Sequence, residues 1–217
     1  MMKSLILKDL YNIGHNTKSM LFILIIFAVA IIPFSGVSSY IFICSILCSM
    51  MIVTTFSFDD NSNWIRYALI LPISKKNIVL AKFVTLFIFS TCGALTGLVI
   101  GTVGGRITKI IDFSLSTLCE LLFLTLAALV IAMIFGGISI PLVYKFGAEK
   151  GRMLLLVSFL LPIGLCWVIY QLLGALGIEL TEKSIFVLLC CFPIIALLWD
   201  YVMYRISYKI FYNKDNN

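Results

Sequence analysis

The chain has 217 residues, of which 62% are hydrophobic and 12% are charged, and its formal net charge is +6. Its mean hydropathy is +1.12. Soluble domains are about 45–50% apolar and about 25% charged, so this composition excludes a soluble globular protein and predicts an all-α integral membrane protein.

Residues 1–18 predict an amphipathic helix that lies at the membrane interface. At about 100° per residue, four apolar side chains share one face of this helix, and polar side chains such as Lys8 lie opposite. The alternative is a frayed, solvated start to the chain. The apolar face comprises Met2, Ile6, Leu10 and Ile13.

Six apolar stretches follow, each close to the length of about 20 residues that a helix needs to cross a bilayer. Together they predict one polytopic transmembrane domain over residues 1–217. Only the sequence S-G-V-S-S separates the first two stretches, which predicts a tight helical hairpin. The predicted spans are 19–36, 39–58, 79–105, 115–143, 153–176 and 184–204.

The distribution of basic residues predicts the orientation. Of the 16 Lys and Arg residues, only Arg106, Lys109 and Lys183 lie on one side of the predicted spans, and the other 13 lie on the opposite side. Basic residues are enriched on the cytoplasmic side of a membrane protein. We therefore expect a multi-pass protein of the cell membrane with both termini and the segment 59–78 in the cytoplasm.

The third span carries four glycines at intervals of four residues, so they line one helix face. Small residues at this spacing allow two membrane helices to approach closely. We expect a close helix–helix contact, either within the subunit or between subunits; glycine with no packing role is the alternative. The glycines are Gly93, Gly97, Gly101 and Gly105.

Two carboxylates, Glu120 and Asp200, fall within or near the predicted hydrocarbon region. A carboxylate there is costly unless it is hydrated or paired. Arg205 follows Asp200 by five residues, which is a poor spacing for a helical ion pair. We interpret both as polar anchors near the membrane surfaces, with a role in a transport pathway as the alternative.

The sequence contains no recognisable catalytic set. A single histidine, His15, cannot form an H-E-x-x-H zinc site, and no G-x-x-x-x-G-K-[ST] phosphate-binding loop is present. Ser139 has no predicted intramembrane base, and the seven cysteines show no metal-binding spacing. We therefore expect no catalytic residue, no metal site and no cofactor on this chain.

Residues 59–78, here called the coupling segment, interrupt the apolar pattern. Asp60, Asn61 or Ser62 is predicted to cap a short helix whose stripe comprises Trp64, Tyr67 and Leu71. Pro72 should end this helix, and Ser74 should cap the next one. The residues alone fit either an aromatic and basic anchor at the interface or a docking surface for a soluble partner.

The coupling segment resembles the signature of ABC-2 type transporter permeases. The matching pattern is acidic–x–W–x–x–Y–x–x–x–L–P–I–S–K–K–x–I–V–x–x–K, ending at Lys82, and the opening L-I-L-K-D-L also resembles the family through Lys8, Asp9 and Leu10. Ile65 and Arg66 fall where the family pattern varies. The residues assigned to ATPase coupling by this resemblance are Asp59, Asp60, Trp64, Arg66, Tyr67, Leu71, Pro72, Ile73, Ser74, Lys75 and Lys76.

The resemblance implies a permease subunit, paired in two copies or with a paralogue, that is driven by a separate ATPase subunit carrying ATP and Mg. It implies that the coupling segment sits in a groove of that ATPase. Small six-span members are similar to exporters of amphipathic peptides, including phenol-soluble modulin exporters and lantibiotic immunity transporters. The Ile- and Lys-rich composition suits a low-GC Gram-positive source. The alternatives are an immunity protein that binds without ATP, and an exporter of a lipid or a small hydrophobic drug.

Overall fold

The computed structural model describes most of the chain and supports an all-α fold. Within the described ranges every regular element is a helix, which confirms the predicted class. The described residues are 2–14, 17–109, 114–148 and 182–214, together with 150, 160, 164, 168 and 171. The helices are α1 (Met2–Gly14), α2 (Thr17–Asn61), α3 (Trp64–Ile70), α4 (Lys75–Ile107), α5 (Leu115–Phe146) and α8 (Glu182–Lys214).

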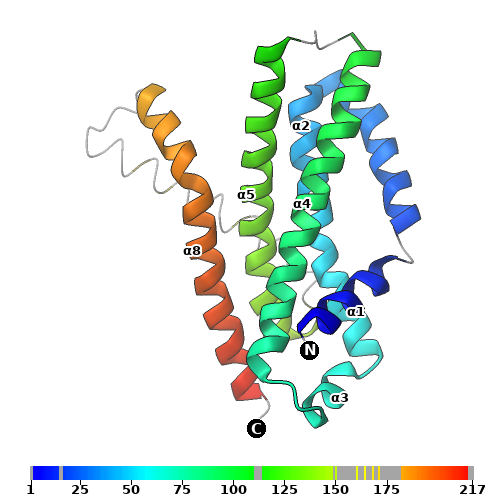
Figure 1. Ribbon diagram of the computed structural model, residues 1–217, viewed down its shortest axis with the longest axis vertical. Helices are drawn as coiled ribbons and strands as arrows, with labels where there is room; N and C mark the ends of the chain where they lie inside the picture. Colours follow the sequence, from blue (N-terminus) through cyan, green and yellow to red (C-terminus); the bar gives the residue numbers. More distant parts are fainter. Residues whose placement is uncertain are drawn as a thin grey trace.

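Three of these helices, α2, α4 and α5, are long and apolar enough to cross a membrane. They stand side by side, and α8 leans against them (Figure 1). Apart from residues 160, 164, 168 and 171, the predicted span 153–176 lies outside the described residues, and so do most side chains in the first third of α8. The described part of the chain therefore shows a multi-span membrane bundle, and the count of six spans stays a prediction.

The long helix α2 consists of two arms that meet at Gly36. Gly36 has φ 80° and ψ 172°, a conformation that is essentially restricted to glycine. The Tyr40 hydroxyl donates a hydrogen bond of 3.0 Å to the carbonyl of Leu24, 16 residues earlier. Sixteen residues of straight helix would rise about 24 Å, so this bond requires the chain to reverse. The predicted hairpin is confirmed (Figure 1).

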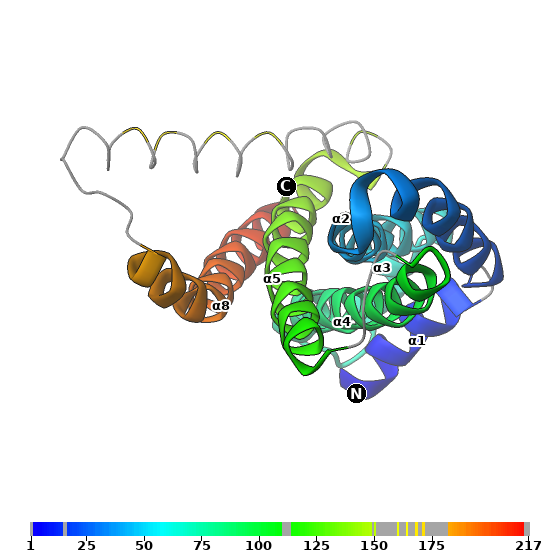
Figure 2. The same cartoon turned by 90° about the horizontal axis from the view of Figure 1, so that it is seen from above.

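Helix α1 crosses one end of the bundle, which we call the α3 end because α3 lies there too (Figures 1 and 2). The helix is where the sequence predicts it, and its apolar face meets the bundle in part. Ile13 of the predicted face is buried and Ile6 packs against the core, but Met2 is exposed. The buried stripe also includes Leu5 and Asp9. A hydrophobic pattern missed Asp9 because it counts a carboxylate as a solvent-facing residue.

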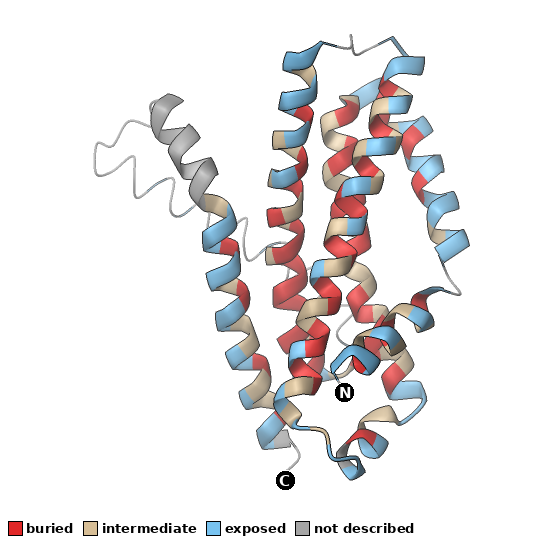
Figure 3. Ribbon diagram, in the orientation of Figure 1, coloured by how far each residue is buried: buried red, intermediate tan, exposed pale blue. Residues whose placement is uncertain are grey.

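The core lies where α2, α4 and α5 face one another, and the outward faces remain apolar (Figure 3). Near the α3 end, the ring of Tyr144 packs against Phe56, with centroids 4.9 Å apart, and against Phe211 at 5.2 Å. These contacts join α2, α5 and α8. Exposed side chains such as Phe22 and Leu198 cover the outside, as expected of helices that contact lipid.

Candidate functional site

The coupling segment folds as a short helix between two sharp changes of backbone direction. Helix α3 follows Asn63, which has a left-handed backbone with φ 51°. It stops at Leu71, whose extended backbone (φ −77°, ψ 152°) is the conformation that a residue before proline prefers. The hydroxyl of Ser74 then accepts a hydrogen bond from the Asn77 N–H and caps α4. The helix end at Pro72 and the cap at Ser74 agree with the sequence prediction.

The predicted cap at the start of α3 is wrong. Asn63 occupies the capping position and makes no side-chain cap bond. Ser62 instead donates its hydroxyl hydrogen to the Phe58 carbonyl, 2.8 Å away. The Asp60 carboxylate accepts a hydrogen bond of 3.1 Å from the backbone N–H of Ala148, beyond the end of α5. Asp60 therefore ties the coupling segment to the end of α5 and does not cap α3.

Helix α3 turns one face to the bundle and one face to the outside. Ala68 is buried, and Trp64 packs partly against the core of the α3 end. Tyr67 is 62% exposed and Ile70 is 83% exposed, and Leu71 is exposed as well. The predicted stripe is thus divided, since Trp64 lies on the inner side and Tyr67 and Leu71 on the outer side. Ile70 is an exposed member that the sequence analysis missed.

Basic residues flank the exposed face of α3. Arg66 and Lys76 are exposed, and residues 61–77 contain no acidic residue. Lys75 lies over the ring of Tyr212, with its nitrogen 5.1 Å from the centroid, and Lys76 lies 5.9 Å from the ring of Tyr208. Pro72 is exposed in the turn that precedes these lysines, and Ile73 packs against the core.

Four charged side chains meet directly beside α3 and form what we call the charge cluster: Lys8, Asp9, Asp59 and Lys82. The Lys82 nitrogen lies 2.6 Å from one Asp59 oxygen and 3.1 Å from an Asp9 oxygen. The Lys8 nitrogen pairs with the other Asp59 oxygen and lies 3.2 Å from Asp9. The cluster therefore joins α1, the end of α2 and the start of α4.

Three members of the charge cluster are buried, and Lys8 is partly exposed. Asp9, Asp59 and Lys82 are only 1%, 3% and 4% exposed. The Lys82 ammonium also donates a hydrogen bond of 3.0 Å to the Thr55 hydroxyl and lies 4.6 Å from the centroid of the Phe56 ring. Buried charges are tolerated only when they are paired and hydrogen-bonded. The two ammonium groups balance the two carboxylates, so the cluster is neutral as a whole.

A cation–π contact links the charge cluster to α3. The Lys8 nitrogen lies 4.7 Å from the centroid of the Trp64 ring, and Trp64 is the first residue of α3. Trp is the strongest aromatic partner for a cation. Lys8 therefore contacts the coupling helix with the same ammonium group that pairs with Asp59.

Sequence reasoning noted each member of the charge cluster but did not bring the members together. Asp9 appeared only in the opening pattern, Lys8 there and on the polar face of the N-terminal helix, and Asp59 and Lys82 in the coupling-segment pattern. A usable signal was present, because two acidic and two basic residues lie at the ends of separate apolar segments. Charges that border several spans on one side of a membrane are candidates for mutual pairing.

Three of the four predicted glycines, Gly93, Gly97 and Gly101, lie on a contact within the chain. A Cβ built on Gly93 would be 2.5 Å from the Cβ of Cys48, and one on Gly97 would be 3.0 Å from the Cβ of Cys44. Real Cβ atoms essentially never approach to 2.5 Å, so α4 and the second arm of α2 pack at Gly93 at a distance that requires glycine. Gly105 is buried as well.

The two predicted intramembrane carboxylates have different surroundings. Glu120 is exposed on α5. Asp200 is buried against α5, where a Cβ on Gly137 would lie 2.3 Å from its Oδ1 atom. No hydrogen-bond donor among the described residues reaches this oxygen, and Arg205 instead donates two bonds to the Tyr201 hydroxyl.

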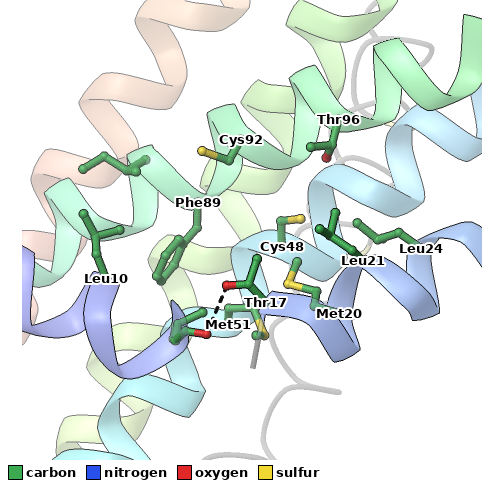
Figure 4. Close-up of a pocket in the computed structure, with 12 residues that line it drawn as sticks. Leu10, Thr17, Met20, Leu21, Leu24, Cys48, Met51, Phe89, Cys92 and Thr96 are labelled. Atoms are coloured by element: carbon green, nitrogen blue, oxygen red, sulfur yellow. Dashed lines mark hydrogen bonds between the residues drawn. The ribbon is translucent and has the colours of Figure 1, made fainter. Parts of the chain in front are cut away.

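An apolar cavity of about 200 Å³ lies between α1, both arms of α2 and α4 (Figure 4). Its two hydroxyl groups are satisfied internally, because Thr17 donates to the Ile13 carbonyl and Thr96 donates to the Gly93 carbonyl. The cavity is smaller than the roughly 300–1,000 Å³ of typical ligand pockets. It can take a short apolar group but not a helical peptide.

A second hollow, of about 390 Å³, borders the coupling segment. Asp60 and Arg66 supply its polar lining, and Tyr144 and Phe211 supply much of its apolar lining. Among the residues that the structure describes, no group of three or more His, Cys, Asp or Glu side chains could hold a metal ion.

The sequence model for ABC-2 family transporter proteins matches residues 4–212. The chain belongs to the ABC-2 transporter family. It is the membrane permease component of such a transporter, a kind of subunit that is typically non-catalytic, and family membership implies an ABC ATPase as its partner. A search of curated proteins found no match to this ABC-2 permease.

Proposed function

We propose that this ABC-2 permease exports amphipathic peptides, and that its α3 helix is the docking point for a separate ATPase subunit. One observation carries the proposal: α3 presents Tyr67, Ile70 and Leu71 to the outside on a short helix attached to the bundle. Exposed aromatic and aliphatic side chains grouped on one helix are typical of a helix that enters an apolar groove. ATP and Mg bind to the ATPase, and this chain contributes no residue to nucleotide chemistry.

The proposed orientation is supported by the distribution of basic residues and by the segments that gather at one end of the bundle. The α3 end carries α1, α3 and the last turns of α8 (Figure 1). The basic excess predicts a cytoplasmic location for these segments. An even number of crossings brings both termini to one side, and six spans satisfy this condition. The exposed face of α3 then meets a soluble protein in the cytoplasm.

The charges around α3 indicate the chemistry expected of the ATPase groove that would bind it. Arg66 and Lys76 are exposed, and no acidic residue occurs within 61–77. Complementary charge at an interface steers association and fixes the register of the partners. The ATPase groove should therefore have an apolar floor for Ile70 and Leu71 and acidic side chains at its rim.

The cargo proposal rests on the family resemblance and on the apolar character of the bundle. The cavity of about 200 Å³ in one protomer is too small to enclose a peptide helix. A peptide would need a path formed by more than one protomer, which agrees with a transporter that contains two permease copies. An amphipathic peptide would reach such a path from the cytoplasm or from the inner leaflet.

Co-purification tests the docking site. The variants Ile70→Asp and Leu71→Asp place a carboxylate on the exposed face of α3, and both should abolish co-purification of the ATPase encoded beside this permease. Ile107→Asp is the matched control, since Ile107 is 76% exposed at the opposite end of α4. Retention of the ATPase by both α3 variants would reject the docking site.

Reconstituted vesicles test the cargo. Amphipathic helical peptides should stimulate ATP hydrolysis by the permease–ATPase complex, and peptides of the same composition in scrambled order should not. Stimulation only by lipids or by small hydrophobic drugs would replace the peptide proposal. A permease that purifies without any ATPase and protects cells by binding alone would support the immunity alternative.

A further inference from the structure

The strongest feature outside the docking face is the way α1 is fastened to the bundle. Asp9 pairs with Lys82 of α4, and Lys8 pairs with Asp59 at the end of α2. The same Lys8 ammonium lies over the ring of Trp64 in α3. One short stretch of α1 thus contacts three other elements through charged groups.

Helix α1 depends on these contacts for its position. Isolated helices of its length, 13 residues, are marginal in water. The side of α1 that points away from the bundle includes Leu7 and Tyr11, both exposed. Leu5 and Ile13 bury apolar surface on either side of Asp9, but apolar contacts alone allow a helix to slide. The ion pairs of Asp9 and Lys8 fix its register.

The charge cluster also restricts independent movement of its parts. If α1 or α4 moved away alone, a carboxylate or an ammonium group would remain buried without its partner. Leaving a buried charge uncompensated is strongly unfavourable. The arrangement is stable against displacement only when the four groups move together, so the elements that carry them behave as one rigid body.

We propose that Lys8, Asp9, Asp59 and Lys82 are positioning residues that clamp α1 to the coupling segment. The clamp makes α1, α3 and the adjoining ends of α2 and α4 move as one body when the ATPase subunit changes state. This proposal rests on the proposed function of α3 as the docking point for the ATPase. In this arrangement α1 carries the movement of the coupling segment out to the membrane surface.

Distance measurements on the complete permease–ATPase complex test the clamp. Spin-labelled unnatural amino acids at Tyr11 of α1 and Ser62 beside α3 leave the native cysteines unchanged, and both positions are exposed. The distance between these labels should be the same without nucleotide and with a non-hydrolysable ATP analogue. The distance from Ser62 to a label at Leu115, at the far end of α5, should change between the same two states.

The outcomes separate the clamp from the docking proposal. If the ATPase binds and the Tyr11–Ser62 distance changes as much as the Ser62–Leu115 distance, the clamp is wrong and the docking site stands. If the ATPase does not bind the wild-type permease, both proposals are wrong. If the Tyr11–Ser62 distance stays constant while the Ser62–Leu115 distance changes, the result supports both the clamp and the docking site.

A charge reversal provides a second test. Lys82→Asp replaces the attraction to Asp9 and Asp59 by repulsion, so it should reduce ATP-driven transport by about tenfold or more while the ATPase still co-purifies. The conservative variant Lys82→Arg keeps a positive charge between the two carboxylates and should retain most of the transport. A merely structural role is excluded if Lys82→Asp loses the constant Tyr11–Ser62 distance and Lys82→Arg keeps it. Normal transport by Lys82→Asp would overturn the clamp.

Discussion

Lys82 and Asp59 form a close ion pair of the charge cluster, with 2.6 Å between the ammonium nitrogen and a carboxylate oxygen. The two residues come from α4 and α2, and both are almost fully buried. A buried ion pair contributes less to stability than its short distance suggests, because both ions must lose their hydration. Removing one partner alone is costly, because the remaining charge stays buried without compensation.

Replacing Lys82 by methionine should lower the free energy of unfolding by about 3–5 kcal/mol, because it leaves Asp9 and Asp59 buried with one ammonium group between them. Chemical unfolding of the detergent-solubilised protein, followed by circular dichroism, measures this loss. The matched control is Lys76→Met, which removes an exposed ammonium group. Equal stability of the two variants would contradict the burial of the cluster.

Alanine at Gly93 should destabilise the protein by about 1–3 kcal/mol, the cost expected for forcing extra atoms into a packed contact. The new methyl group would lie 2.5 Å from Cys48 Cβ and 2.9 Å from the Cys44 carbonyl oxygen. Gly14→Ala serves as the control, because nothing lies within 4 Å of a Cβ there. Melting temperatures in a common detergent compare the two, and a similar value for both would argue against the close contact.

The hairpin of α2 should depend measurably on the Tyr40 hydroxyl. Tyr40→Phe removes its hydrogen bond to the Leu24 carbonyl and should cost about 1 kcal/mol. Tyr11→Phe removes an exposed hydroxyl for which no hydrogen bond is seen among the described residues, and it should have no effect. Parallel denaturant titrations of the two variants give the comparison; a stability loss confined to Tyr11→Phe would be incompatible with the hairpin geometry.

The same chemical change should have opposite effects at Asp200 and Asp59. Asp200→Asn removes a buried charge whose Oδ1 atom has no donor among the described residues, so stability should rise or stay constant. Asp59→Asn removes the partner of two ammonium groups and should destabilise. Thermal unfolding of both variants tests the contrast. Loss of transport by a stable Asp200→Asn protein would favour a role for Asp200 in the transport pathway.

Local features of the fold were predictable from the sequence because their causes lie within a few residues. Pro72 restricts Leu71 directly, and Ser74 reaches an N–H only three residues away. The reversal near Gly36 was predicted because small and polar residues interrupt two apolar stretches. Each of these predictions needed the chain conformation alone and no knowledge of the neighbouring helices.

Long-range features were not predictable in the same way. The partners of the charge cluster are up to 73 residues apart, and Asp60 accepts its hydrogen bond from Ala148, 88 residues away. Because the Asp60 carboxylate binds this distant N–H, it does not cap α3, which is the role that its local position suggested. The stripe through Trp64 and Tyr67 was correctly placed on a helix, but the side of the helix that meets the bundle depends on α1, which supplies Lys8.

The reversal at Gly36 places α1 beside residues that are synthesised much later. A straight helix with the 45 residues of α2 would be about 68 Å long and would carry α1 to the opposite end of the bundle. Because the chain folds back, Lys8 and Asp9 return to the level of Asp59 and Lys82. Synthesis proceeds from the N-terminus, so α1 emerges long before Lys82 exists. The ion pair between Asp9 and Lys82 therefore forms only after α4 has begun to form, long after α1 itself has been made.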